Sequence, residues 1–295
     1  MQPILECCCG VDVHRDMIEA CIIKGMDNPI FIRERFTTFQ NDLQNFVKWL
    51  FENDCYNIAM ESTGVYWRPV YEAIEEYSQY YESILVANAH NMRNIPGRKT
   101  DVKDAEWIAT LFQHGLLEPS FVPERTIRDL REFSRTYKNS VSEKVRCLNR
   151  LEKFLQTHGF KLSSVLSDIN SVSGIRILTI LSEKGSLAVS DVQNAISSNT
   201  KKSAYEIQLA VCGRLNPNEC FLLSDFLDQL NLIQSHIDKI LSKMQEIAAP
   251  YANILEQLDS IPGIDITAAL LILAEIGSNP QDHFKTSAHL CSWAG

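Results

Sequence analysis

The sequence predicts a mixed α/β domain followed by a long helical region. Three short runs of β-type residues open the chain, at 7–13, 17–24 and 30–37, with a turn at Asp27-Asn28-Pro29 between the second and the third. Segments with helical and strand patterns then alternate. In the second half, apolar residues recur every three or four positions, as on one face of an amphipathic helix. Three antiparallel strands followed by alternating helices and strands is the order of a ribonuclease H-like fold, and few other folds begin that way.

The rest of the first half is predicted as three helices and two strands. Apolar residues at helical spacing, from Leu43 to Leu50, predict the first of these helices. Thr100 is a good N-cap for the last, which runs from Asp101 to about Gln113 and which Gly115 closes. The elements predicted before this last helix are the helix 41–53, the strand 58–60, the helix 65–77 and the strand 83–86.

Two long helices are predicted in the second half. Apolar residues recur from Leu130 to Leu155, so the first helix extends to about Gly159. Within 223–247 the apolar positions alternate strictly by three and four until Pro250, and such a heptad seam predicts coiled-coil packing. The pattern leaves two partners open for this seam, the first long helix or another subunit.

Two similar segments each precede an apolar helix. Asp259–Ile264 contains Ile-Pro-Gly-Ile and resembles a helix–hairpin–helix turn, whose tight Gly and exposed amides can hold a phosphate. A plain helix N-terminus is the alternative, and it is favoured for Asn170–Ile175. The regions predicted from these patterns are a ribonuclease H-like domain at 1–122, a helical coiled-coil region at 123–257, and a segment with the hairpin turn at 258–295.

Composition narrows the class of protein. The apolar content is 45%, which is ordinary for a globular protein. No apolar run reaches the roughly 18 residues of a membrane span, and the N-terminus has no basic region followed by a long apolar core, so neither a membrane protein nor a secretory signal is predicted. The nine cysteines are odd in number and form no Cys-x-x-Cys pair. They indicate a reducing cytoplasm, where cysteine acts as a small hydrophobe, and we expect a cytoplasmic, nucleoid-associated protein.

The charge distribution permits nucleic-acid binding despite a net charge of −9. Residues 93–161 hold 14 Lys/Arg against 9 Asp/Glu, so this stretch is basic inside an acidic chain. A basic stretch can follow a phosphate backbone. A solvated helix face is the alternative, and charge alone does not separate the two.

Four acids fall where a ribonuclease H-like fold would gather them. Asp12 and Glu61 each end an apolar strand-like run, and Asp101 and Asp104 lie one helical turn apart on one face. Cleavage of a phosphodiester by two metal ions needs carboxylates around Mg²⁺ ions about 3.5–4 Å apart, and Mg²⁺ prefers such oxygen ligands, with Mn²⁺ as a substitute. Each acid alone is typical of a solvated carboxylate at the end of a strand or helix. In this order, the four together favour a metal site.

Basic and aromatic residues near these acids are candidates for nucleic-acid contacts. His14, two residues after the first acid, is more typical of a turn residue than of a ligand. Tyr66 and Trp67 follow Glu61 and can stack on bases, although core packing is the commoner role of aromatic residues. The predicted phosphate contacts precede or flank the last two acids: Arg93, Arg98, Lys99 and Lys103.

These segments resemble the IS110/IS1111 family of insertion-sequence transposases, relatives of the Piv-type DNA invertases. The resemblance rests on Gly10-Val11-Asp12-Val13-His14, Met60-Glu61-Ser62-Thr63-Gly64, the block from Arg98 to Ala105, Ile261–Ile264, and Ser292-Trp293-Ala294-Gly295. It covers essentially the whole chain. The Arg-Lys-Thr-Asp-x-x-Asp-Ala block is its most specific part.

The resemblance implies a RuvC-like Asp-Glu-Asp-Asp domain, a coiled-coil region and a C-terminal transposase domain. It also implies DNA strand cleavage and rejoining, assembly as a dimer or tetramer on DNA, and a structured guide RNA encoded by the element. In the family, a serine of the C-terminal domain attacks DNA and forms a phosphoserine. That serine lies beyond the Trp-Ala-Gly segment, so this chain is expected to be C-terminally truncated, and neither Ser287 nor Ser292 takes the role.

Three functions compete on the sequence alone. The first is an insertion-sequence recombinase, which leaves a covalent protein–DNA species. The second is a RuvC-like nuclease that uses metal-activated water and leaves free ends. The third is a remnant that binds nucleic acid or oligomerises through the seam at 223–247 and cleaves nothing.

Overall fold

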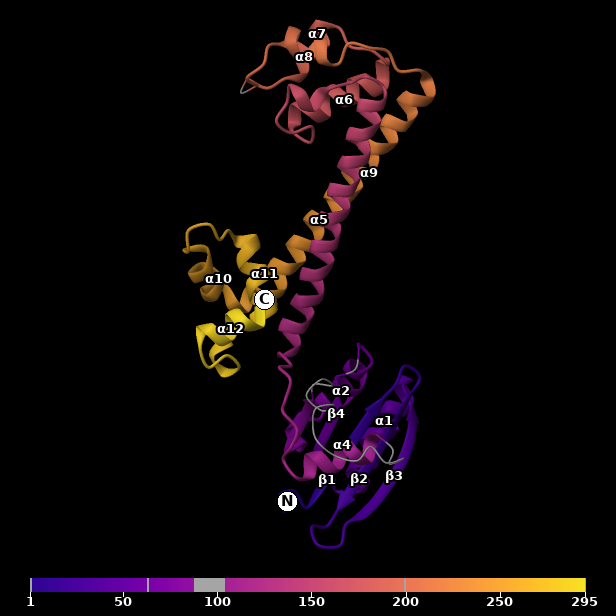
Figure 1. Cartoon of the computed structure of the whole chain (residues 1–295), viewed down its shortest axis with the longest axis vertical. Helices are drawn as coiled ribbons and strands as arrows, with labels where there is room; N and C mark the ends of the chain where they lie inside the picture. The colour runs from indigo at the N-terminus through magenta and orange to yellow at the C-terminus, as the bar shows by residue number, and fades with distance from the viewer. Residues whose placement is uncertain (1, 63, 88–103, 199, 295) are drawn as a thin grey trace. The chain divides into compact units, whose positions relative to one another are not determined.

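A computed structural model describes residues 2–62, 64–87, 104–198 and 200–294. The chain splits into two compact units, Met1–Val122 and Pro123–Gly295 (Figure 1). The first is mixed α/β and the second is helical, so the predicted fold class is confirmed at this level. In the described part of the chain, no helix combines the length and the apolar character needed to cross a membrane.

The first unit is built on one five-stranded sheet. Its spatial order is β3-β2-β1-β4-β5, in which β1–β3 are antiparallel and β4 and β5 run parallel to β1. The first three strands end where the sequence predicts, and the last two are slightly longer than predicted. The strands are β1 (Cys7–Val13), β2 (Met17–Lys24), β3 (Ile30–Thr37), β4 (Asn57–Glu61) and β5 (Ser83–Ala87).

Helices cover both faces of this sheet because its central strands, β1 and β4, are buried on both sides. On one face, α1 (Gln40–Glu52) and α2 (Trp67–Glu75) bury Leu43, Phe46 and Ile74 against the strands, and the short η1 (Ser78–Tyr80) follows α2. On the other face, α4 (Asp104–Gln113) buries Ile108 and Leu111.

The helix predicted over 65–77 is shorter in the structure. It begins at Trp67, with Tyr66 at the N-cap position, and ends at Glu75. Val65 is largely exposed, so nothing extends the apolar face of the helix toward its start. The predicted start of α4 at Asp101 and its cap Thr100 lie outside the described residues.

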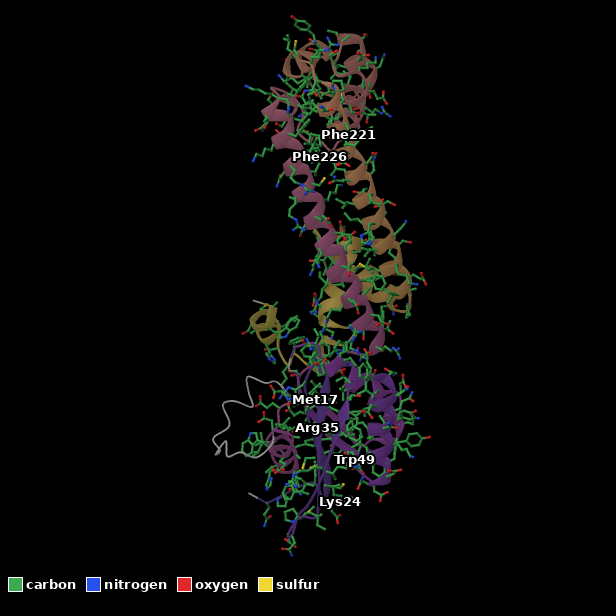
Figure 2. The ribbon with its side chains drawn as sticks, turned by 90° about the vertical axis from the view of Figure 1, so that its right-hand side faces the viewer. Met17, Lys24, Arg35, Trp49, Phe221 and Phe226 are labelled. Atoms are coloured by element: carbon green, nitrogen blue, oxygen red, sulfur yellow. The ribbon has the colours of Figure 1, made fainter. Side chains whose placement is uncertain are left out.

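Two long helices dominate the second unit. α5 (Arg125–Thr157) and α9 (Pro217–Ile247) run antiparallel and side by side (Figure 1). Heptad positions of α9 such as Leu230 and Ile237 are buried, and Phe226, marked in Figure 2, faces Phe154 of α5 with ring centroids 5.7 Å apart. The partner of the seam in this chain is therefore α5.

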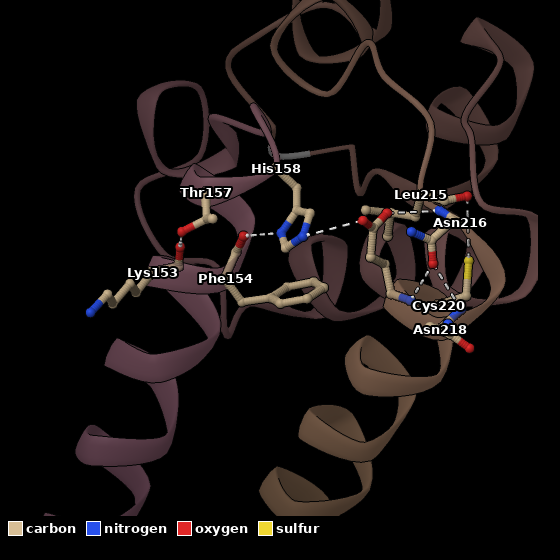
Figure 3. Close-up of polar contacts among 9 residues, drawn as sticks. Lys153, Phe154, Thr157, His158, Leu215, Asn216, Asn218 and Cys220 are labelled. Carbon is tan, nitrogen blue, oxygen red and sulfur yellow. Dashed lines mark hydrogen bonds and ion pairs between the residues drawn. The ribbon is translucent and has the colours of Figure 1, made fainter.

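Polar contacts join the end of α5 to the start of α9 (Figure 3). His158 Nδ1 lies 2.8 Å from the carbonyl of Phe154, and its Nε2 lies 3.5 Å from a carboxylate oxygen of Glu219. Asn216 caps α9 by accepting hydrogen bonds from the amides of Asn218 and Glu219. The predicted end of α5 is confirmed to within two residues, and Gly159, with a φ of +83°, follows it.

Small helices pack at each end of this pair. At the end formed by residues 157 and 217 they are η2 (Leu162–Ser164), α6 (Val172–Lys184), α7 (Val189–Ala195) and α8 (Ala204–Ala210), and at the other end η3 (Ala249–Tyr251), α10 (Ala252–Asp259), α11 (Ile266–Ile276), η4 (Pro280–Asp282) and α12 (Ser287–Ala294).

The two similar turns differ in structure. Ser171 caps α6 by accepting from the amide of Gly174, which is a plain helix N-terminus. Gly263 has a φ of +91° between the packed helices α10 and α11, which forms a hairpin. The Asp265 carboxylate caps α11 by accepting a hydrogen bond from the amide of Ala268. Its negative charge would repel a phosphate bound at this turn.

An arginine of α5 anchors α11. Arg131 Nε donates to the carbonyl of Ala274 at 3.0 Å, and its Nη2 donates to the carbonyl of Glu275 at 2.8 Å. A cation at the C-terminus of a helix also interacts favourably with the helix dipole. Arg131 therefore has a structural role, and it is one of the basic residues that gave 93–161 its positive charge.

Candidate active site at the sheet edge

Two of the predicted acids end adjacent parallel strands. Asp12 lies near the end of β1 and Glu61 at the end of β4, and Val11 pairs with Met60 in the register of the two strands. The carboxyl ends of parallel neighbours meet at the same edge of a sheet. The sheet therefore brings Asp12 and Glu61 to one edge, as the order of elements predicts.

The third acid comes from the helix packed on β1. Asp104 is the first described residue of α4. The helix lies very close to β1 at Gly10, where a Cβ atom would fall 2.2 Å from the amide nitrogen of Ala109. Glycine at position 10 therefore allows α4 to approach the strand, and this approach brings Asp104 toward Asp12.

His14 forms an ion pair with Asp12. Its Nε2 lies 2.9 Å from Oδ2 of Asp12, and the two side chains are 58% and 14% exposed. The amide of His14 also donates to the carbonyl of Met17 in the turn between β1 and β2. His14 is thus a turn residue, as expected, and a partner of the central acid as well. Its spacing of two residues from Asp12 was the available signal.

The charges of the acids act on one another. Burial raises the pKa of the Asp12 carboxyl, the charge of His14 lowers it, and the charges of Asp104 and Glu61 raise it, with a net shift upward. Asp104 and Glu61 are therefore each close enough to Asp12 to repel its charge. Such a site is stabilised by a cation.

The described acids do not by themselves form a tight metal cage. Among the residues that the structure describes, no group of three or more His, Cys, Asp or Glu side chains is placed to hold a metal ion. The fourth predicted acid, Asp101, lies outside the described residues. The donor chemistry of the other three, which is carboxylate oxygen throughout, suits Mg²⁺ or Mn²⁺.

The predicted nucleic-acid contacts are only partly described. The basic residues Arg93, Arg98, Lys99 and Lys103 lie outside the described residues. Tyr66 is 40% exposed. Trp67 is half-buried and packs edge-on against Tyr71, with ring centroids 5.8 Å apart.

Arg15 is a residue near the acids that was not predicted from the sequence as part of the site. This residue follows His14 in the turn between β1 and β2, is 73% exposed, and pairs with Asp16. Tyr66 lies near enough to act on its charge. An exposed arginine thus lies near the strand end that carries Asp12, within electrostatic range of Tyr66. The only sequence signal was a cation three residues after that acid.

Two family models match the chain. Residues 9–160 match a model described as a transposase, of the IS110 DEDD type. Residues 255–295 match a model described as the transposase family IS116/IS110/IS902. No curated protein matches the chain.

Proposed function

The chain belongs to the IS110 family of transposases, since the first of these matches covers more than half of it, and we propose that its first unit cleaves and rejoins DNA strands. In this proposal 1–122 is a ribonuclease H-like, RuvC-like catalytic domain, 123–257 a helical region with coiled-coil packing, and 258–295 part of a C-terminal transposase domain. The observation that supports the proposal is that Asp12 and Glu61 end adjacent strands and that the charges of Glu61 and Asp104 both act on Asp12.

The proposed metal ligands are Asp12, Glu61, Asp101 and Asp104. When bound, Mg²⁺ supplies stabilisation of the charge that develops on the attacking and leaving oxygens of the phosphodiester. Asp12 is proposed as the central ligand because it is largely buried and because the charges of both Asp104 and Glu61 act on it. His14 orients its carboxylate through the contact at Oδ2.

The proposed DNA contacts lie close to the acids in the sequence. Arg93, Arg98, Lys99 and Lys103 are proposed to bind phosphates, which position the strand. Tyr66 is better exposed than Trp67 for stacking on a base, because Trp67 packs against Tyr71.

The proposal extends to partners that the family implies. We infer a structured guide RNA that selects the DNA, and a dimer or tetramer as the working form. Because the heptad seam of α9 packs on α5, contacts between subunits would use other residues of these helices. Leu232 and Val145 are 73% and 51% exposed on α9 and α5, and they are candidates for such contacts.

A calorimetric titration with Mn²⁺ tests the metal site. We expect the wild-type chain to bind Mn²⁺, and Asp12→Asn and Asp104→Asn to lose at least about tenfold in affinity, because each removes a charged ligand. Asp16→Asn is the matched control, since Asp16 lies four residues after Asp12 but is 73% exposed and paired with Arg15. Equal affinity in all four proteins would refute the site.

The products of cleavage separate the recombinase from a simple nuclease. We expect Mn²⁺-dependent strand cleavage of DNA that Asp104→Asn abolishes and Asp16→Asn retains. A covalent protein–DNA species supports serine recombination, and free ends support hydrolysis by water. DNA binding without cleavage under Mg²⁺ or Mn²⁺ would indicate a chain that only binds nucleic acid.

A further inference from the structure

The long helix α5 carries an excess of positive charge. It holds nine Lys/Arg against four Asp/Glu, whereas α9, which packs beside it, holds two against five. The whole chain has a net charge of −9. α5 is therefore a basic helix in an acidic chain, and its partner helix is acidic.

Some of the cations of α5 stabilise the fold of the second unit. Arg131 donates to two carbonyls at the end of α11, and Nζ of Lys138 lies 3.5 Å from Oε1 of Glu275. Arg128 is buried and donates to the carbonyl of Pro123 at 2.9 Å. These side chains are held by the protein itself, so they do not explain why the rest of the helix is basic.

Four other cations of α5 have no such role. Their side chains are exposed, and none of them makes an ion pair or a side-chain hydrogen bond with any residue that the structure describes: Arg135, Arg146, Arg150 and Lys153. On other exposed helix faces, cations pair with a carboxylate four residues away, as Lys48 does with Glu52 and Lys202 with Glu206. The four cations of α5 are therefore available to a partner.

The four cations form one stripe along α5, which we call the basic stripe. Successive residues of an α-helix are about 100° apart, so the four fall within an arc of about 60°. The buried Leu151 and Leu155 lie on the opposite side of the helix, which packs on α9. Figure 3 shows Lys153 extending away from α9. From Arg135 to Lys153 the stripe is about 27 Å long, at a rise of about 1.5 Å per residue.

The charges of the basic stripe repel one another. Arg146 and Arg150 are four residues apart, and Arg150 and Lys153 are three apart, so both pairs are neighbours on the helix surface. Like charges at these spacings destabilise a helix. A polyanion that binds along the stripe would relieve this repulsion, whereas water alone leaves it in place.

We propose that the basic stripe binds the phosphate backbone of double-stranded DNA. The stripe offers a straight line of cations, and a length of about 27 Å spans about 8 base pairs of a duplex at 3.4 Å per pair. Single-stranded nucleic acid is normally held by exposed aromatic rings as well as by cations. The part of α5 between Arg135 and Lys153, which the structure describes completely, exposes no aromatic ring. The choice of DNA rests on the proposed function.

Contacts of this kind hold and orient a duplex without reading its sequence. Asn139, Ser142 and Asn149 lie on the same face of α5 as the stripe and carry neutral hydrogen-bond donors that suit phosphate oxygens. Binding by the stripe should therefore depend strongly on salt and little on the sequence of the DNA.

The test is fluorescence anisotropy of the full chain with a labelled duplex of arbitrary sequence, in the presence of a chelator and over a range of salt concentrations. The stripe variant carries Arg146→Gln and Arg150→Gln. The control carries Lys239→Gln and Lys243→Gln, which remove the same charge at the same spacing from α9. Each phosphate contact contributes about 0.9 to the slope of log affinity against log salt, so the slope of the stripe variant should be shallower by about 1.8.

This change of slope has a measurable consequence. Between about 50 and 200 mM salt, the wild type should lose about 12-fold more affinity than the stripe variant, and at the lower salt it should bind the duplex at least about tenfold more tightly. The control variant should keep the slope and the affinity of the wild type. Thermal unfolding shows that both variants are folded, which we expect because the replaced side chains are on the surface.

A variant with the opposite effect tests the stripe a second time. Glu143 is exposed, and it lies three residues before Arg146 at the flank of the stripe. Glu143→Gln removes a negative charge there, so it should tighten the binding of the duplex. This variant decides the question even if the double variant does not fold.

The result does not depend on the metal site, because the chelator removes metal. A shallower slope in the stripe variant would support the stripe even if the wild type failed to bind Mn²⁺ or to cleave DNA, which would refute only the proposed function. Equal slopes in the wild type, the stripe variant and Glu143→Gln would overturn the stripe, whether or not the chain cleaves DNA. A loss of affinity for duplex RNA alone would overturn the assignment to DNA.

Discussion

The replacement of Gly10 by alanine tests how the site is assembled. An added Cβ would lie 2.2 Å from the nitrogen of Ala109, 2.3 Å from the oxygen of Ala105 and 2.8 Å from the Cα of Ala109. These are backbone atoms of α4, so no change of rotamer relieves the overlap. Because non-bonded carbon atoms prefer separations of about 3.5–4.0 Å, the helix must move from β1 by about 1 Å.

The structure gives the size of the effect. Overpacking of a buried site costs about 1–3 kcal/mol, and we expect Gly10→Ala to lie at the upper end, about 3 kcal/mol, because backbone must yield. The same movement displaces Asp104, the first described residue of α4. A misplacement of about 1 Å can lower a rate about 100-fold, so metal affinity and strand cleavage should fall together.

Urea unfolding followed by tryptophan fluorescence measures the change. Three of the four tryptophans, at 49, 67 and 107, lie in the first unit and report on its unfolding. Gly64→Ala is the control, because Gly64 has a φ of +59° and its Cβ would meet only the Tyr66 ring, at 3.7 Å. It should cost about 1 kcal/mol through backbone strain alone. If Gly10→Ala is no more destabilising than this control, the close approach of α4 does not matter.

Three further changes have definite expected outcomes. Asp12→Asn should stabilise the metal-free protein at neutral pH, because the pKa of Asp12 is raised in the fold and its negative charge is unfavourable there. Thermal unfolding measures this gain in stability over the wild type. The gain should vanish as the pH falls through the raised pKa toward about 4, where Asp12 is protonated in both states. Arg131→Ala should destabilise the helical unit by about 1.5–3 kcal/mol, because two charge-assisted hydrogen bonds to α11 are lost. Urea unfolding followed by circular dichroism measures this change. An unchanged unfolding midpoint would contradict the structural role of Arg131. Tyr66→Ala should weaken binding of single-stranded DNA by about tenfold, since stacking contributes about 1–3 kcal/mol per base. Tyr77→Ala, which removes an equally exposed ring at 40%, should leave that affinity unchanged, and equal losses in the two variants would argue against stacking by Tyr66.

The strands of the sheet could be predicted from the sequence because the residue pattern that indicates each strand lies within that strand. The first three strands end at the predicted residues, and the adjacency of Asp12 and Glu61 follows from the order of the elements. The start of α2 was predicted less accurately, since the helix expected from Val65 begins at Trp67 and Val65 is exposed.

Contacts between residues that are far apart in the chain could not be predicted from the sequence. A heptad pattern shows an apolar stripe on α9 but does not identify the helix that covers it, which in this chain is α5. The closeness of α4 to Gly10 depends on the packing of the helix on β1, which no local pattern predicts. The ion pair between His14 and Asp12 required the shape of the turn as well as the spacing.

The most direct test of the account is a crystal structure of the full chain soaked with Mn²⁺, with the metal located by its anomalous scattering. We expect a peak within coordination distance of the carboxylates of Asp12, Glu61 and Asp104. A peak elsewhere, or none at this sheet edge at saturating Mn²⁺, would contradict the claim that these acids form one metal site.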